Sequence, residues 1–352
     1  MDIYVYNSNL ERIGLIDVYQ SLIWTKRYYQ LGDFELYIPA STELFEILQK
    51  DNILVREDDD SLMVIEHIEI TTDVETGNYI IVSGRSIESY LSRRIVRYQT
   101  NIDNTVENAI RQLIDENAIN TKDNYRVIPN LTLGTAQGFA DTLKMQITYD
   151  NLCDCVISLC QSYRYGFKIV LENNKLVFNL YQGVDHSYSQ NTNPYVTFSP
   201  EFDNLINSHY VTNKQEYKNY AYVFGEGEGS KRSIRAVSLK AGHTPNGLDL
   251  HELYVDAKDL TTNDGEIGTR EYGELLYTRG IEKLNESKET IAFEGEVNSN
   301  LSYQYKKDYN LGDIVQITNE YGITTKARIT EIIESESDSG TELVPTFEYE
   351  EE

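Results

Sequence analysis

The sequence predicts a mainly β protein with an α+β section in its middle. Three observations lead to this prediction. The first hundred residues, and the residues after Asn204, read as short runs of β-branched and aromatic residues separated by turn residues. Between these two parts, apolar residues recur with the 3.6-residue period of amphipathic helices. Tyrosine is unusually frequent, with 28 Tyr against 10 Phe and a single Trp, and Tyr favours half-buried strands and protein interfaces.

The first hundred residues are expected to form a β-barrel wall followed by a short helix at IESYLSRR. Strand patterns lie at 3–6, 12–18, 21–29, 34–39 and 52–57. The clearest hairpin pairs LMVIEHIEIT with YIIVSG around the turn DVETGN. Its first arm is expected to place on one face Val64, Glu66, Ile68 and Ile70. This alternation is imperfect, and it fits a barrel wall better than a flat open sheet.

The middle section predicts two helices and a hairpin. An amphipathic helix is expected from about residue 103, on the apolar positions Val106, Ala109, Ile110, Leu113 and Ile114. Asn104 with Glu107 three residues later resembles a capping box. A second helix is expected from about Tyr149 to Tyr163. The hairpin joins FKIVLE to KLVFNLY through a two-asparagine turn.

The last part returns to strands, with a helical block at about 264–286. The strand patterns are NLINSHYVT, NYAYVFG, RSIRAVSL, ETIAFEGEVN, DIVQITN, KARITEIIES and LVPTFEY. We therefore expect a first β-barrel domain at 1–100, an α+β domain at 101–203, and a second β-barrel domain at 204–352 with a helical insertion at about 250–287. The turns Leu31-Gly32-Asp33 and Leu311-Gly312-Asp313 are alike. They fit a duplicated β-domain or chance, because Gly-Asp turns are common.

The charge excludes several function classes. With 57 acidic and 31 basic side chains, the net charge is −26. Such a chain has no electrostatic source for sequence-independent binding of nucleic acid or of anionic membranes. No signal-peptide pattern or membrane-spanning apolar run is visible. We expect a soluble protein made in a cytoplasm.

No pattern identifies an active site. Cys153, Cys155 and Cys160 have neither zinc-site spacing nor a spacing that closes a disulfide within a helix, so we expect free thiols packed as small apolar groups. The tip from Asp58 to Asp60 could chelate a hard cation, but a solvated turn is favoured because the ligand pattern of a calcium loop is missing. The loop GEGEGSKR is expected to join two strands rather than cradle phosphate, because no helix follows it. We assign no catalytic, cofactor-binding or metal-ligating residue and expect no cofactor.

Landmarks along nearly the whole chain resemble tail proteins from siphophages of Gram-positive hosts. The run LIWTKRYYQLGDFELYIP resembles their Trp-x-x-Arg-Tyr and Gly-x-Phe-Glu-Leu-x-x-Pro pattern, on Trp24, Arg27, Tyr28, Gly32, Phe34, Glu35, Leu36 and Pro39. The run VSGRSIESYLSRRIV is similar to a second element of that family, on Gly84, Ser86, Leu91, Arg93 and Arg94. VFGEGEG, YNLGDIVQI, ARITEIIES and PTFEY follow in the family's order.

The resemblance implies a baseplate hub that caps the tail tube. It implies a homotrimer whose subunits each supply two tail-tube-like β-barrels, so that six barrels continue the sixfold tube. The implied partners are the distal tail protein or tail tube, the tape-measure protein and receptor-binding tip proteins. The implied location is the virion tail tip, after assembly in the host cytoplasm, with transient passage of DNA and no stable membrane association.

Two other functions stay open. Many relatives carry a C-terminal peptidase, glycosidase or stalk, and none follows the second β-region here, so we expect a structural protein and not an enzyme. The alternatives are a cell-wall-degrading tail hydrolase and a carbohydrate- or receptor-binding module, since exposed Tyr and Trp stack on sugars. The acidic side chains could line a lumen for DNA or lie outside, as the nine between Glu331 and Glu352 suggest. Trp24, Phe34 and Leu36 are expected to be barrel core.

Overall fold

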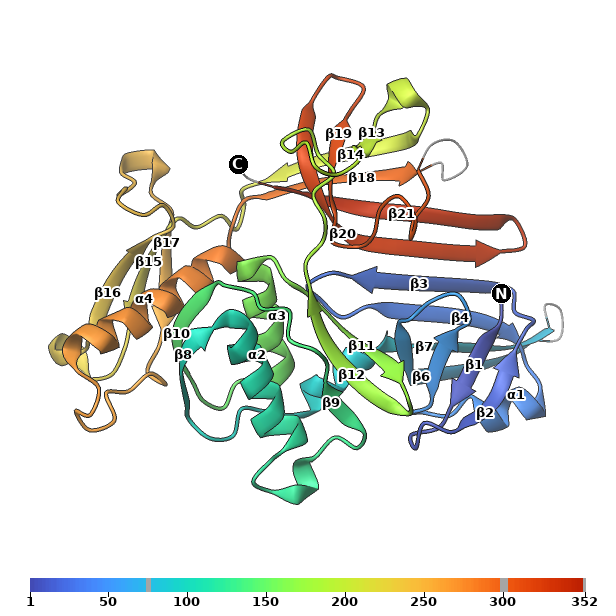
Figure 1. Ribbon diagram of the computed structural model, residues 1–352, viewed down its shortest axis with the longest axis horizontal. Coiled ribbons are helices and arrows are strands. Elements are labelled where there is room, and N and C mark those ends of the chain that lie inside the picture. The colour runs from blue at the N-terminus through green and yellow to red at the C-terminus, as the bar shows by residue number, and fades with distance from the viewer. Residues whose placement is uncertain (74–76, 298–302, 351–352) are drawn as a thin grey trace.

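The computed structural model describes residues 1–73, 77–297 and 303–350. Figure 1 shows the first β-region in blue beside the second in red, the helical middle section in green below them, and a small orange unit that projects to one side. The predicted turn DVETGN falls in part on residues 74–76, outside the described residues, as do residue 298 of a predicted strand and the last two acids. No helix of the described chain is long and apolar enough to cross a membrane.

The first β-region is one antiparallel sheet in the order β3-β4-β7-β6-β5-β1-β2. Its strands are β1 (Ile3–Tyr6), β2 (Arg12–Ile16), β3 (Ser21–Arg27), β4 (Asp33–Pro39), β5 (Ile53–Arg56), β6 (Leu62–Asp73) and β7 (Gly77–Ser86). A short helix α1 (Thr42–Ile47) and a 3₁₀ helix η1 (Ile87–Arg93) complete it. One face of the sheet buries Trp24, Phe34 and Leu36, which confirms their prediction as core.

A β-bulge in β6 changes the predicted faces of this strand. The pairing with β7 shifts register between Ile65 and His67, and a bulge moves the following residues to the opposite face. Ile65 and Ile68 therefore pack on the same core, whereas Val64 packs on the core of the middle section. The prediction that Val64 and Ile68 share a face was wrong for this reason. Gly84 lies opposite the bulge, where an added Cβ would stand 1.9 Å from the Val64 carbonyl oxygen.

The middle section packs two helices against short strands. Its elements are β8 (Thr100–Thr105), α2 (Val106–Ile114), the π-turn η2 (Asp115–Ile119), η3 (Asn124–Arg126), β9 (Leu131–Leu133), β10 (Thr142–Ile147), α3 (Leu152–Tyr163), β11 (Gly166–Glu172) and β12 (Lys175–Tyr181). The two-asparagine turn joins β11 to β12 as predicted, with both asparagines at positive φ. All three cysteines are free and buried in this core.

The cap of α2 differs from the predicted capping box. Thr105 is the N-cap, and its hydroxyl accepts a hydrogen bond from the Asn108 amide. Glu107 is buried and accepts from three successive backbone amides, those of residues 137–139. A buried carboxylate needs such donors. Glu107 therefore fixes a loop of the middle section and does not cap its own helix.

The second β-region continues the same sheet. Its strands are β13 (Thr197–Phe198), β14 (Leu205–Asn213), β18 (Thr290–Val297), β19 (Ile314–Thr318), β20 (Thr324–Ser337) and β21 (Gly340–Tyr349), with the 3₁₀ turn η4 (Pro200–Phe202). Within the described residues, the two β-regions form an open run of strands that ends at β14 and β2. In the part of the chain that the structure describes, these strands do not close into the two separate barrels that were expected.

A small α+β unit is inserted between β14 and β18, which pair with each other. It holds β15 (Tyr220–Phe224), η5 (Gly229–Lys231), β16 (Ile234–Ser238), η6 (Gly247–Asp249), β17 (Glu252–Asp256) and the long helix α4 (Thr269–Glu286). The unit has its own apolar core between α4 and the three strands. The helical insertion predicted at about 250–287 is thus part of a unit that also includes β15 and β16. GEGEGSKR forms the connection between those two strands.

The two β-regions share one strand order. The first reads β3-β4-β7-β6-β5-β1, and the second reads β14-β18-β21-β20-β19-β13, with strands in the same sequence along the chain. The registers also agree. Ile53 of β5 pairs with Val64 of β6, and at the equivalent place Ile314 of β19 pairs with Arg328 of β20. Both β6 and β20 have a β-bulge within the next three residues. One pair differs, because β1 and β5 are antiparallel whereas β13 and β19 are parallel.

The two similar Gly-Asp turns do not lie at equivalent positions of the two β-regions. Leu31-Gly32-Asp33 leads into β4, whereas Leu311-Gly312-Asp313 leads into β19. These strands are not equivalent, since the counterpart of β4 is β18. The topology is therefore repeated, and the shared tripeptide is not the trace of that repeat.

Candidate functional site: the junction of the two β-regions

The two β-regions are joined edge to edge by the strands β3 and β20. Residues 21–27 of β3 pair antiparallel with residues 331–337 of β20, from Arg27 opposite Glu331 to Ser21 opposite Ser337. More than 300 residues of sequence separate these partners. Because the pairing runs between sheet edges, it turns two sheets into one continuous surface.

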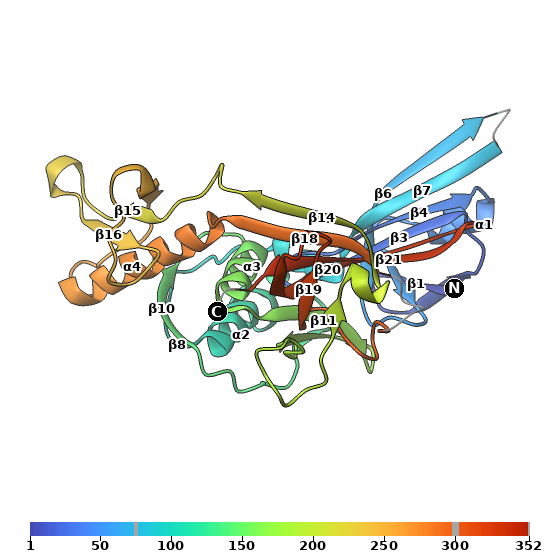
Figure 2. The same ribbon diagram turned by 90° about the horizontal axis from the view of Figure 1, so that it is seen from above.

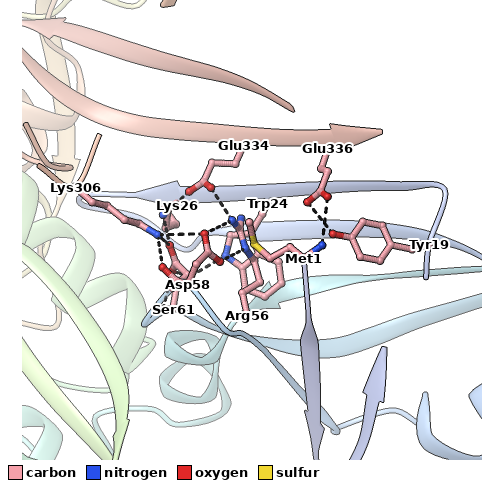
Figure 3. Close-up of polar contacts among 11 residues, drawn as sticks. Met1, Tyr19, Trp24, Lys26, Arg56, Asp58, Ser61, Lys306, Glu334 and Glu336 are labelled. Atoms are coloured by element: carbon pink, nitrogen blue, oxygen red, sulfur yellow. Dashed lines mark hydrogen bonds and ion pairs between the residues drawn. The ribbon is translucent and has the colours of Figure 1, made fainter. Parts of the chain in front are cut away.

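A buried carboxylate lies at the centre of this junction. The side chain of Asp59 is 1% exposed and contacts the ammonium groups of Lys26 and Lys306, the latter at 2.8 Å. Burial alone would raise the pKa of Asp59, but the two lysines outweigh burial and hold that pKa well below its usual range. The Ser61 hydroxyl donates to Asp59 and accepts from the Trp24 indole at 2.8 Å. Figure 3 shows Trp24, Lys26, Ser61 and Lys306 of this group close together.

The position of Asp59 corrects the prediction for the acidic tip. A solvated turn was expected for residues 58–60, yet Asp59 is enclosed by two cations from distant segments. The ion-pair partners lie more than thirty residues before and more than two hundred after it, so the local sequence carries no sign of them. Asp60 does match the expectation, because its side chain is 62% exposed beside Lys168.

The line along which β3 pairs with β20 is called the seam below. Glu334 of β20 extends the network of ion pairs across this seam. Its carboxylate contacts Lys26 at 2.6 Å and Arg56 at 2.8 Å. The Arg56 guanidinium also contacts Asp58 at 2.9 Å and lies 5.6 Å from the centre of the Trp24 ring. A buried arrangement of this kind is stable only when every charge keeps a partner. The junction therefore tolerates its buried charges because both β-regions supply them.

The ends of the seam are held in the same way. At one end, Arg27 bridges Glu331 and Asp33. At the other, Glu336 accepts a hydrogen bond from the Tyr19 hydroxyl at 2.7 Å and lies 3.4 Å from the Met1 amino group. The acids of β20 thus pair with the first β-region. The sequence left open whether the acids of the C-terminal segment lie outside or line a lumen, and Glu331, Glu334 and Glu336 are at most 28% exposed and take part in this junction.

The second Gly-Asp turn also contacts the first β-region. Gly312 has φ +95°, and an added Cβ would stand 2.3 Å from the ring of Tyr28. Asp313 is buried and accepts hydrogen bonds from the amides of Val184 and Asn310, each at 2.7 Å. Only glycine allows both this backbone conformation and this approach. The turn therefore joins the second β-region to the first and to the segment after β12.

A cavity of about 550 Å³ opens beside the junction, where the two β-regions meet the middle section. Lys26, Asp59 and Lys306 line it, together with Glu88 and Tyr181. Glu88 accepts a hydrogen bond from the Ile169 amide at 2.6 Å, and burial raises the pKa of its carboxyl. Among the described residues, no cluster of His, Cys, Asp and Glu has the arrangement of a metal site.

Family and fold comparisons agree with the architecture. The model of the family described as Siphovirus ReqiPepy6 Gp37-like protein matches residues 2–347. The chain belongs to this family. The resemblance to siphophage tail proteins is thereby confirmed. No curated protein matches the sequence.

Solved structures described as tail proteins share the fold of this family member at low sequence identity. A prophage tail protein gp18 from Listeria monocytogenes EGD-e has a TM-score of 0.55 at 12% identity, over 98% of this chain and 94% of that one. A tail protein from Neisseria meningitidis MC58 has a TM-score of 0.55 at 11% identity, over 99% and 96%. The 43 kDa tail protein of prophage MuSo2 from Shewanella oneidensis has a TM-score of 0.55 at 14% identity, over 99% and 98%.

Sequence reasoning found part of the junction and missed its chemistry. Trp24, Arg27 and Tyr28 were singled out by resemblance, and all three lie at the seam. Arg56, Asp59 and Glu334 were missed as partners. A weak signal existed, since Glu334 and Glu336 alternate on one face of a predicted strand, yet an acidic chain contains many such pairs.

Proposed function

We propose that this chain is a structural hub of the phage tail tip. Three copies form a ring, and each supplies two barrel-like β-regions, so that six similar regions continue the sixfold tail tube. The ring connects the distal tail protein or tail tube and the tape-measure protein to the receptor-binding apparatus. One observation supports this most: a single chain carries two sheets of the same strand order, already joined edge to edge. A ring of three subunits can match a sixfold tube in this way, because each subunit supplies two similar β-regions.

The role of the chain is then geometric and electrostatic, without catalysis. DNA leaving the tube meets a ring of chains that each carry a net charge of −26. Acidic surfaces repel the phosphate backbone, which favours passage over binding. The continuous sheet across β3 and β20 keeps the two β-regions of one chain in a fixed relation, as a ring wall requires.

Solution mass tests the proposal directly. Light scattering at several concentrations, with the protein alone and with the tail-tube protein of the same phage, is expected to give three times 40.5 kDa, about 122 kDa, for the hub. A monomer under every condition would contradict the ring. Electron microscopy of assembled tails then checks that the trimer sits at the tip.

A receptor-contacting role for the inserted unit is the second candidate. Tyr222 and Tyr254 stand opposite each other on the outer face of its sheet, 37% and 62% exposed. Exposed tyrosines stack on sugar rings and anchor protein contacts. Binding of the protein to host cells, lost in Tyr254→Ala, would support this role. A cell-wall hydrolase remains the third reading, and loss of wall turbidity on adding the protein would reveal it.

A further inference from the structure

Two sheet edges remain open at the positions equivalent to the two that are joined. Within the described residues, no strand pairs with the outer edge of β14, and none pairs with β6 beyond its contact with β5, along residues 67–73. Figure 2 shows β14 along one border of the molecule and the β6–β7 hairpin projecting beyond the other strands. Unpaired edges of this length present a row of free N–H and C=O groups, which is a template for pairing with another strand.

The repeated strand order shows that the edge of β6 in the first β-region corresponds to the edge of β20 in the second. In β20 the register shifts between Ile329 and Glu331, and in β6 it shifts between Ile65 and His67. Counting from these bulges, residues 331–337 of β20 correspond to residues 67–73 of β6. These are the residues with which β20 pairs with β3. The free edge of β6 is thus the counterpart of the edge that is already occupied in the second β-region.

The other side of the seam corresponds in the same manner. Trp24 of β3 stands opposite Phe34, with ring centres 5.9 Å apart, and Tyr210 of β14 stands opposite Phe293, with ring centres 6.4 Å apart. Phe34 and Phe293 occupy equivalent places in the pairings with β7 and β21. Trp24 therefore corresponds to Tyr210, and the free edge of β14 to the edge of β3 that β20 covers.

The exposed fractions of corresponding residues differ as expected if the edges of β14 and β6 each lack a neighbouring strand. Trp24 is 0% exposed, because β20 lies beside it, whereas Tyr210 is 38% exposed. Glu334, which faces Trp24 across the seam, has a side chain only 11% exposed, whereas its counterpart Ile70 is 50% exposed. Both exposed residues are large and apolar, unlike the polar residues that usually protect an open edge. A strand on each edge would bury them.

We propose that β14 of one copy pairs antiparallel with residues 67–73 of β6 in a second copy of this chain. The register repeats that of β3 on β20 and places Tyr210 opposite Ile70 of the neighbouring copy, Val211 opposite Glu69 and Thr212 opposite Ile68. This inference rests on the proposed ring and specifies how its subunits join. Tyr210 with Ile70 forms an aromatic and β-branched cross-strand pair, a combination that stabilises sheets.

A second copy is the occupant that the chain itself supports. Within each chain, the edge of β3 already pairs with the edge of β20. The equivalent edges, those of β14 and of residues 67–73 of β6, are both open in each copy as described, so β14 of one copy can pair with β6 of another. The contact is therefore heterologous, with a different surface on each side. Such contacts close into a ring when the rotation between copies is suitable, and otherwise continue as a filament.

Engineered disulfides test the pairing and its register. Directly opposite residues of an antiparallel pair have Cα atoms about 4.5–5.5 Å apart, within reach of a disulfide. The full-length variant Tyr210→Cys with Ile70→Cys is expected, after mild oxidation, to give covalent species of two and three chains on a non-reducing gel. The control Tyr210→Cys with Thr72→Cys shifts the partner by two residues, about 6.6 Å along the strand, and is expected to cross-link far less. The single variants and the parent, whose three cysteines are buried, are expected to remain single chains.

The outcomes separate this inference from the proposed function. A trimer by light scattering without cross-linking of the 210–70 pair, or with better cross-linking of the 210–72 pair, overturns the pairing and leaves the ring standing. A covalent ladder that runs far beyond three chains supports the pairing and overturns the closed trimer. A monomer under all conditions, with no cross-linking, overturns both.

A charge substitution gives a second measurement that does not depend on disulfide geometry. Ile70→Lys places a charge in the proposed seam, and because Ile70 is exposed in the single chain, folding is expected to be unchanged. The variant is expected to shift the solution mass from trimer to monomer, while circular dichroism shows the secondary structure of the parent. The matched control is Leu248→Lys in the inserted unit, where Leu248 is 98% exposed and far from both edges in sequence, and it is expected to stay trimeric. A trimeric Ile70→Lys variant would overturn the proposal.

Discussion

The two β-regions have one strand order but opposite surroundings at equivalent edges. The β3 edge of the first region is covered by β20 and bound through buried ion pairs of Lys26, Arg56 and Glu334. The equivalent β14 edge of the second region is open and presents Tyr210. The difference teaches that two sheets of one topology can be joined at one edge by buried ion pairs, while the equivalent edges stay open in the single chain as described and carry the exposed Tyr210 and Ile70.

The largest effect is expected from removing the carboxylate at the centre of the closed seam. Asp59→Ala leaves the buried Lys26 with Glu334 alone of its two carboxylate partners and removes the carboxylate beside Lys306. Breaking a buried ion pair on one side costs up to about 3–5 kcal/mol of unfolding free energy. The matched control is Asp60→Ala, whose exposed pair with Lys168 is expected to contribute at most about 1 kcal/mol. Urea unfolding of both variants measures the difference. Equal losses would mean that burial does not distinguish the two carboxylates.

The same carboxylate makes the closed seam sensitive to acid. The folded pKa of Asp59 lies below that of an unfolded aspartate, about 3.9. Its contribution is therefore fully present above about pH 4 and is lost as the pH falls through the folded value. Unfolding free energies measured from pH 5 down to pH 2 should fall more steeply in the parent than in Asp59→Asn. Parallel curves would remove Asp59 as the source of this acid sensitivity.

A smaller effect is expected where the second β-region touches the first through Gly312. Gly312→Ala adds a methyl group that meets the Tyr28 ring at 2.3 Å, and such overpacking costs about 1–3 kcal/mol. Gly322→Ala has a similar positive φ of +77° but no atom within 4 Å of the new methyl group. The difference between the two variants therefore isolates the contact with Tyr28. Thermal unfolding measures it, and equal melting temperatures would show that backbone strain alone matters there.

The smallest effect is expected at the end of the seam. Tyr19→Phe removes the hydrogen bond from the Tyr19 hydroxyl to Glu336, worth about 0.5–1.5 kcal/mol. A double-mutant cycle with Glu336→Ala, which removes the acceptor, measures the coupling between the two side chains by urea unfolding. A coupling of zero would place Tyr19 outside the seam's energetics, and the closed edge would then depend on its centre alone.

Local elements were largely predictable from the sequence. The period of the apolar residues gave α2 and α3, and the two-asparagine turn gave the β11–β12 hairpin. Details that depend on one residue's surroundings were less accessible. The bulge in β6 reverses the faces of its later residues, and Thr105 caps α2 in place of Asn104.

The junction was predictable only in its outline. Resemblance drew attention to Trp24, Arg27 and Tyr28, but not to the strand that covers them. Any of the predicted strand edges could pair with any other, so the match of β3 with β20 is not visible in either segment. Asp59 reads as a solvated acid for the same reason, because Lys306 and Lys26 reach it only after the chain has folded.

By itself, the sequence determined the type of the elements with a clear period or turn, such as α2, α3 and the β11–β12 hairpin, and the total charge of −26. Periodicity and turn chemistry act between neighbouring residues, so they can be read from the chain in order. The tertiary structure alone decided which edges are joined, which acids are paired and which apolar residues stay open. These choices depend on contacts between residues up to 335 positions apart, and such contacts exist only once the two repeated sheets lie side by side.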